Sequence, residues 1–226
     1  MNTVLPAHTK TDADELMAMI LLEEIYHKPF LKSESPDLYS EDETIGCEVT
    51  RAYLPEYERY NGKLLSDERK GVVRDITQIT SFNADINKVM VRIQERTVDK
   101  MHKLYVYKDY PMKCLYVKTL IWSFYFELHA LPNMFDSLRE QIISKCRELY
   151  DSEYKEYHVL FVECADMFIV WDWINNSLIL RPDIFDRYKE CCPMVFHLID
   201  NEISNNISAV NNTPFKEVSR LFSKGE

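Results

Sequence analysis

Glycine is scarce in this sequence, with only 4 residues among 226. This scarcity argues against a β-sandwich rich in tight turns and against a glycine-rich phosphate-binding loop. The N-terminal segment lacks a basic region followed by an apolar one, so no secretory signal peptide is predicted. The most apolar stretch, residues 114–128, contains Lys118 and is too short to span a bilayer. We therefore expect a soluble, cytoplasmic protein.

Cysteine and histidine patterns typical of transition-metal sites are also missing. The 6 cysteines include no C-x-x-C pair, and the 6 histidines form no H-x-x-x-H or H-E-x-x-H pattern. Zinc and dithiol redox chemistry are therefore unsupported, and in a cytoplasmic protein we expect reduced cysteines.

Basic charge is in deficit, because the net charge is −10. Such a balance argues against a protein that coats nucleic acid through bulk attraction. The charge is uneven, however, at −8 over residues 1–50, +3 over residues 51–103 and −5 over the remainder. The basic segment is either an ordinary solvated surface or a local contact for phosphates. Its candidate phosphate-binding residues are Arg51, Arg59, Lys63, Arg69, Lys70 and Arg74.

The sequence has enough apolar residues, 46%, to bury the core of one large domain. Helical periodicity is predicted at residues 11–28, 84–106 and 134–150. Strands are predicted at 44–53, 113–127, 158–164, 167–173 and 177–181, with short extended pieces at 30–33 and 36–40. This order predicts an α/β domain over residues 1–200, with a central mixed sheet flanked by helices. Residues 54–83 are predicted to form a long loop, and residues 201–226 a linker and short helix.

Three carboxylates stand out against these elements. Glu15 heads an apolar stripe of the first helix, Asp37 follows Pro36, and Glu48 lies in a strand that otherwise resembles core. A hairpin over residues 38–47 brings Asp37 and Glu48 together, and two converging carboxylates repel unless a cation neutralises them. Hard oxygen ligands suit Mg²⁺ or Mn²⁺.

The pattern P36-D37…E48-V49-T50 resembles the PD-(D/E)XK nuclease superfamily over roughly residues 11–125, in members whose strand contains Glu-x-Thr. The resemblance implies a restriction-endonuclease-like core of a helix, three meandering strands, a second helix and a further strand. The remaining residues are a C-terminal extension of the same sheet. It further implies DNA, or RNA, as substrate and phosphodiester hydrolysis by a metal-activated water. By analogy, such a chain suits host defence, restriction or a mobile element.

Carried over by position, the resemblance implies that Asp37, Glu48 and the Val49 carbonyl bind the metal, with Glu15 as auxiliary ligand. The sequence departs from the pattern at Thr50, where the superfamily has a catalytic lysine. A threonine hydroxyl can hold a water but brings no positive charge. Lys100, on the margin of the apolar stripe of the second helix, is the candidate substitute.

Each of these residues also has an ordinary structural interpretation. Glu48 would pair with a cation across an edge strand, Asp37 would cap a turn, and Glu15 would favour a helix N-terminus. Lys100 would be a lysine whose ammonium reaches solvent past a core stripe. The missing motif lysine and the acidic charge favour a second hypothesis, a catalytically inactive nuclease fold that binds a protein partner.

Overall fold

The computed structural model describes residues 13–55, 85–106, 108–119, 121, 126, 129–150, 155–164 and 167–184. Within these residues the predicted α/β class is confirmed, because a seven-stranded mixed sheet is flanked by helices. The predicted loop at 54–83 lies almost entirely outside the described residues, and the predicted C-terminal linker and helix lie wholly outside them. The same holds for Arg59, Lys63, Arg69, Lys70 and Arg74.

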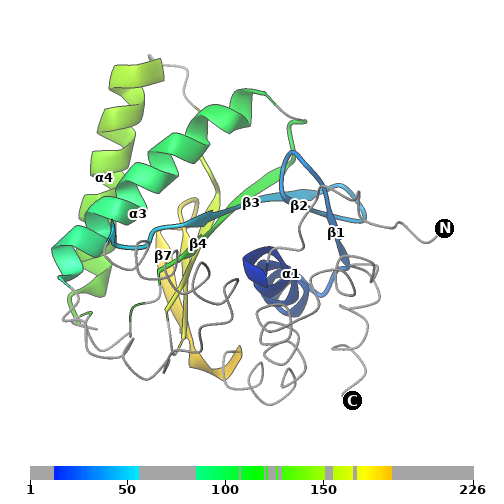
Figure 1. Cartoon of the computed structure of the whole chain (residues 1–226), viewed down its shortest axis with the longest axis horizontal. Coiled ribbons are helices and arrows are strands. Elements are labelled where there is room, and N and C mark those ends of the chain that lie inside the picture. Colours follow the sequence, from blue (N-terminus) through cyan, green and yellow to red (C-terminus); the bar gives the residue numbers. More distant parts are fainter. Residues whose placement is uncertain are drawn as a thin grey trace, which may run out of the picture.

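The strands are arranged in the sheet in their order along the chain (Figure 1). The first half contains α1 (Ala13–Tyr26), β1 (Phe30–Lys32), β2 (Leu38–Ser40), β3 (Ile45–Arg51), α3 (Ile86–Met101) and the 3₁₀ helix η2 (His102–Tyr105). The second half contains β4 (Met112–Lys118), α4 (Leu131–Tyr150), β5 (Val159–Glu163), β6 (Phe168–Asp172) and β7 (Ser177–Arg181). Strands β1 to β3 form an antiparallel meander, β3 to β5 are parallel, and β5 to β7 are again antiparallel.

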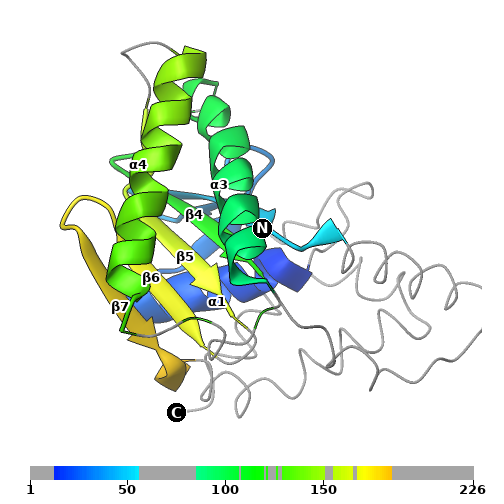
Figure 2. The ribbon, with the colours of Figure 1, turned by 90° about the vertical axis from the view of Figure 1, so that its left-hand side faces the viewer.

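The two faces of the sheet carry different helices (Figure 2). Helices α3 and α4 cover one face, as expected when each connects two neighbouring parallel strands, and α1 covers the other. The strand alternation matches this division: Leu115 and Val117 of β4 belong to the core under α3 and α4, whereas Cys114 and Tyr116 belong to the core under α1. The side-chain period of 2 therefore sets which layer each strand residue joins.

Helix α3 combines a polar start with one buried stripe. The Asp85 side chain accepts a hydrogen bond from the Asn87 amide at 3.1 Å and caps its N-terminus. Val89, Ile93 and Met101 are buried along the face that packs on the sheet. The predicted helical stripe is confirmed, and it fixes the direction in which Lys100 leaves the helix.

The C-terminal half of the sheet carries an aromatic core. Trp171 and Trp173 are almost wholly buried, and the Trp171 ring packs edge-on against Phe135 with centroids 4.8 Å apart. Both tryptophans are therefore core residues. Asp172 pairs with Ser177 across the hairpin that joins β6 to β7. In the described part of the chain, no helix has the length and apolar character that a membrane span needs.

Candidate active site on strand β3

Asp37 and Glu48 lie on the face of the sheet that carries α3. The register pairs Leu38 with Cys47, and both of these side chains enter the core under α1. Because successive strand residues alternate, Asp37 and Glu48 face the other way. The Val49 amide donates a hydrogen bond to Asp37 Oδ2 at 2.7 Å, which fastens the turn before β2 to β3.

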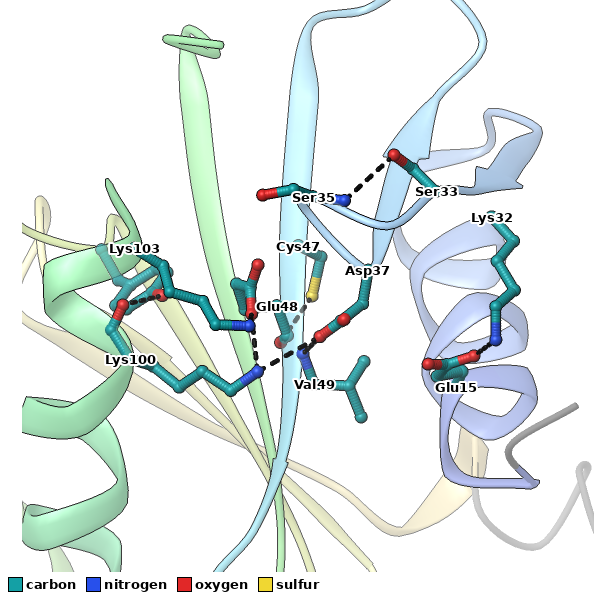
Figure 3. A network of polar contacts seen from close by, with 11 residues as sticks. Glu15, Lys32, Ser33, Ser35, Asp37, Cys47, Glu48, Val49, Lys100 and Lys103 are labelled. Carbon is teal, nitrogen blue, oxygen red and sulfur yellow. Dashed lines mark hydrogen bonds and ion pairs between the residues drawn. The ribbon is translucent and has the colours of Figure 1, made fainter. Parts of the chain in front are cut away.

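Lys100 joins the two carboxylates. Its Nζ lies 2.6 Å from Glu48 Oε2 and 3.4 Å from Asp37 Oδ2 (Figure 3). Lys100 is 52 positions from Glu48 and 63 from Asp37 in the sequence, so the packing of α3 on β3 brings them together. The predicted proximity of Lys100 to Asp37 and Glu48 is therefore observed, whereas its catalytic role stays a prediction.

Lys103 is a second cation that sequence reasoning missed. Its Nζ lies 3.1 Å from the same Glu48 Oε2 that accepts from Lys100. The available signal was its spacing, because residues three apart on a helix project from one face. Figure 3 shows both lysines reaching toward Glu48 from the end of α3.

The electrostatics of this group follow from burial. The Glu48 side chain is 0% exposed, and an ionised carboxylate in such a place requires cationic or hydrogen-bonding partners. Burial alone would lower the pKa of Lys100, but the charges of Asp37 and Glu48 outweigh it and raise that pKa above its ordinary value. Lys100 is therefore protonated at neutral pH, which makes it a source of positive charge and not a base.

The donor set suits a hard divalent cation only in part. Glu48 Oε1 is buried and has no hydrogen-bond partner among the described residues. Such an orphaned carboxylate oxygen, beside the Asp37 carboxylate, fits an oxygen-preferring ion such as Mg²⁺ or Mn²⁺. The two ammonium groups already balance the two negative charges, however, so an ion would compete with them for Glu48.

Glu15 does not join the other two carboxylates. It lies on α1, on the opposite side of β3 in Figure 3, where it forms an ion pair with Lys32. Among the described residues, no three or more His, Cys, Asp or Glu side chains form a group that could hold a metal ion. The structure thus gathers Asp37 and Glu48 but not the predicted set of three.

The remaining predicted site residues have mixed placements. Thr50 follows Glu48 by two positions and shares its strand face, half-buried. Val49 contributes its amide to Asp37, while metal binding by its carbonyl stays a prediction.

Arg51, the one predicted phosphate contact among the described residues, lies on the α1 face of the sheet. Its guanidinium forms an ion pair with Asp14, a buried residue of the first turn of α1. Lys118 binds the other oxygen of Asp14 at 2.7 Å and approaches Glu163 at 3.6 Å. Strands β3, β4 and β5 end at Arg51, Lys118 and Glu163. A second polar network therefore lies at the C-terminal ends of these three parallel strands.

Two further contacts support the candidate active site. Tyr157, itself buried, donates a hydrogen bond from its hydroxyl to the Lys100 carbonyl at 3.0 Å and holds the end of α3. At Gly46, a Cβ would lie 2.7 Å from Tyr110 Cδ2 and 3.2 Å from Pro36 Cγ. The glycine therefore lets the turn that carries Asp37 pack closely on β3.

Comparison of the chain with protein-family models, with curated proteins and with solved structures finds no significant match.

Proposed function

We propose that this chain is a metal-dependent nuclease-like protein that hydrolyses phosphodiester bonds in DNA. The proposal rests on one observation, the contact of the Lys100 ammonium with both Asp37 and Glu48. In the PD-(D/E)XK pattern the lysine follows the glutamate on the same strand. Here the equivalent positive charge comes from Lys100 of α3, which would replace the lysine that is missing at position 50. The order α1, β1 to β3, α3, β4 supports the same proposal.

Asp37, Glu48 and the Val49 carbonyl are the residues that would hold Mg²⁺ or Mn²⁺. When bound, the ion supplies a water of lowered pKa and offsets charge that develops on a phosphate. The carboxylates fit this role because both are fixed before any ligand arrives, Glu48 by burial and Asp37 by the Val49 amide. Such preorganisation removes the cost of orienting the groups during the reaction.

The chain's own residues divide the remaining work. Lys100, protonated at neutral pH, meets negative charge on the phosphate and donates hydrogen bonds to an attacking water. The Thr50 hydroxyl, on the same strand face as Glu48, gives that water a second hydrogen-bonding partner. Tyr157 positions Lys100 through its hydrogen bond to the helix backbone.

A second function has its own support. Both carboxylates are already neutralised by lysines, and the described residues contain no group of three acidic or other metal-binding side chains. A nuclease-like fold that retained a salt bridge in place of an ion would act as a protein-binding or regulatory subunit. This alternative accounts for the ion pairs without assigning them a catalytic role.

Nuclease assays separate the two functions. Plasmid, single-stranded DNA and RNA are incubated with the purified protein and Mn²⁺ or Mg²⁺, alongside Glu48→Gln and Lys100→Gln. Lys88→Gln is the matched control, because Lys88 is an exposed lysine at the opposite end of α3. We expect cleavage by the wild type and by Lys88→Gln, and its loss in the other two variants.

Equal cleavage by all four proteins indicates a contaminant and refutes this active site. Calorimetry with Mn²⁺ supplies an independent measurement, since Asp37→Asn should abolish the binding heat. If the wild type shows neither cleavage nor metal binding, the inactive interaction protein is the better description.

A further inference from the structure

The two lysines beside Glu48 are not equivalent. The Lys100 side chain is 17% exposed and contacts two carboxylates, whereas the Lys103 side chain is 36% exposed and contacts one. The Lys103 contact is also the longer, at 3.1 Å against 2.6 Å to the same oxygen. Glu48 therefore remains paired without Lys103.

This redundancy makes Lys103 the lysine that can change partners. An ion pair with one well-exposed member contributes little to stability, because water screens the charges and the long side chain loses entropy when fixed. Releasing Lys103 leaves no buried charge alone, since Lys100 still neutralises Glu48 Oε2. Releasing Lys100 would strip Asp37 and Glu48 together.

Lys103 lies at the margin of the site, with 36% of its side chain exposed and its ammonium directed at Glu48. It belongs to η2, the 3₁₀ turn that continues α3, and its ammonium converges with that of Lys100. Two ammonium groups at one oxygen repel each other, so an incoming anion relieves that repulsion by taking the more exposed one. A phosphate oxygen is a strong acceptor for a lysine ammonium.

We propose that Lys103 binds a phosphate of the nucleic-acid backbone and so holds the substrate beside Asp37, Glu48 and Lys100. This inference rests on the proposed nuclease function and adds to it a residue for substrate binding. Lys100 remains with the carboxylates, while Lys103 exchanges Glu48 for the substrate.

Binding is measured by fluorescence anisotropy of a short labelled oligonucleotide, single-stranded and duplex, in EDTA at several salt concentrations. We expect Lys103→Gln to weaken binding several-fold and to reduce the slope of log K against log salt by about 1, the effect of one lost phosphate contact. Lys103→Arg keeps the charge and should bind like the wild type. Lys88→Gln, the matched loss of a lysine from the other end of the helix, should leave both quantities unchanged.

Steady-state cleavage adds a readout that a purely structural role would not give. Lys103→Gln should raise KM with kcat largely kept, because it removes a contact made equally in ground and transition states. Lys100→Gln should instead lose kcat.

Two results overturn the inference while the nuclease proposal stands. The first is a wild type that cleaves while Lys103→Gln matches it in binding, salt slope and KM. The second is a Lys103→Gln protein that loses thermal stability and kcat together and is not rescued by Lys103→Arg, which assigns Lys103 a structural role. A wild type that neither binds nor cleaves nucleic acid refutes the nuclease proposal and this inference together.

Discussion

Replacing Lys100 by Met tests whether the buried ion pair is kept for stability or for chemistry. The substitution keeps an unbranched side chain of similar length but removes the ammonium that contacts both Asp37 and Glu48. Glu48, which is 0% exposed, keeps Lys103 as its one remaining ion-pair partner among the described residues. Breaking a buried ion pair costs about 3–5 kcal/mol, because the remaining charge stays desolvated. Lys103 retains its contact at 3.1 Å, so we expect the lower end, about 3 kcal/mol.

The double variant Glu48→Leu/Lys100→Met is the informative comparison. It removes the charges of Glu48 and Lys100 and fills the same space with apolar groups beside the core under α3. The charges of Asp37 and Lys103 remain, and both of these side chains are partly exposed. Replacing a buried pair in this way is often neutral or stabilising. We therefore expect the double variant to unfold within about 1 kcal/mol of the wild type and to have no nuclease activity.

Urea denaturation of the wild type, both single variants and the double variant gives the four corners of a double-mutant cycle. The slope of the free energy against urea concentration should be constant across the set, so that midpoints report stability alone. The reasoning is refuted if Lys100→Met loses less than about 1 kcal/mol, the size of an average substitution. It is equally refuted if the double variant is no more stable than Lys100→Met.

Three further perturbations test the surroundings of the site. Gly46→Ala places a Cβ 2.7 Å from the Tyr110 ring, so thermal unfolding should show a loss of about 1–3 kcal/mol, the usual cost of overpacking. Tyr157→Phe removes the 3.0 Å hydrogen bond to the Lys100 carbonyl and should cost about 0.5–1.5 kcal/mol, with faster amide exchange confined to the end of α3. Burial alone would raise the pKa of Asp14, but its two basic partners outweigh this and lower it below 3.8. The stability that ionised Asp14 contributes is then present above pH 3.8 and is lost as the pH falls through the lowered pKa. The difference in unfolding free energy between wild type and Asp14→Asn should therefore shrink in acid. A difference that stays constant with pH contradicts this.

The sequence was sufficient for the order and type of the elements and for the direction of Lys100, although β4 ends at Lys118, before the predicted end at residue 127. Helical periodicity in residues 84–106 placed Lys100 on the margin of the buried stripe, and period-2 alternation placed Glu48 opposite Cys47 and Val49. Both predictions depend on local repeats that the backbone geometry enforces. The α/β class followed from the order of these elements.

Glu15 shows what local patterns cannot determine. Its helix face was predicted to pack on the protein, and α1 does pack on the sheet. Alternation separates the two faces of a strand but does not say which helix covers which face, because that choice depends on long-range packing. Helix α1 covers the face opposite Glu48, so Glu15 pairs with Lys32 instead.

Lys103 was missed although its spacing of three residues from Lys100 was visible in the sequence. The predicted helix continued to residue 106 with a constant period, whereas the chain tightens into a 3₁₀ turn after Met101. In a 3₁₀ turn, residues three apart lie nearly above one another. Lys103 lies in this turn and Lys100 at the end of α3, and the ammonium groups of both contact Glu48 Oε2.

Lys100 lies on a helix, whereas Glu48 lies on a strand, so the two residues can move relative to each other. A lysine two residues after the glutamate on the same strand moves with it as one rigid piece. Here the carboxylates belong to the β2–β3 pair and the ammonium to α3, two bodies joined by side-chain packing. A displacement of α3 along its axis by a fraction of a turn would separate charge from carboxylate and leave the sheet unchanged. A ligand or partner that displaced α3 would therefore change the ion pairs of Asp37 and Glu48.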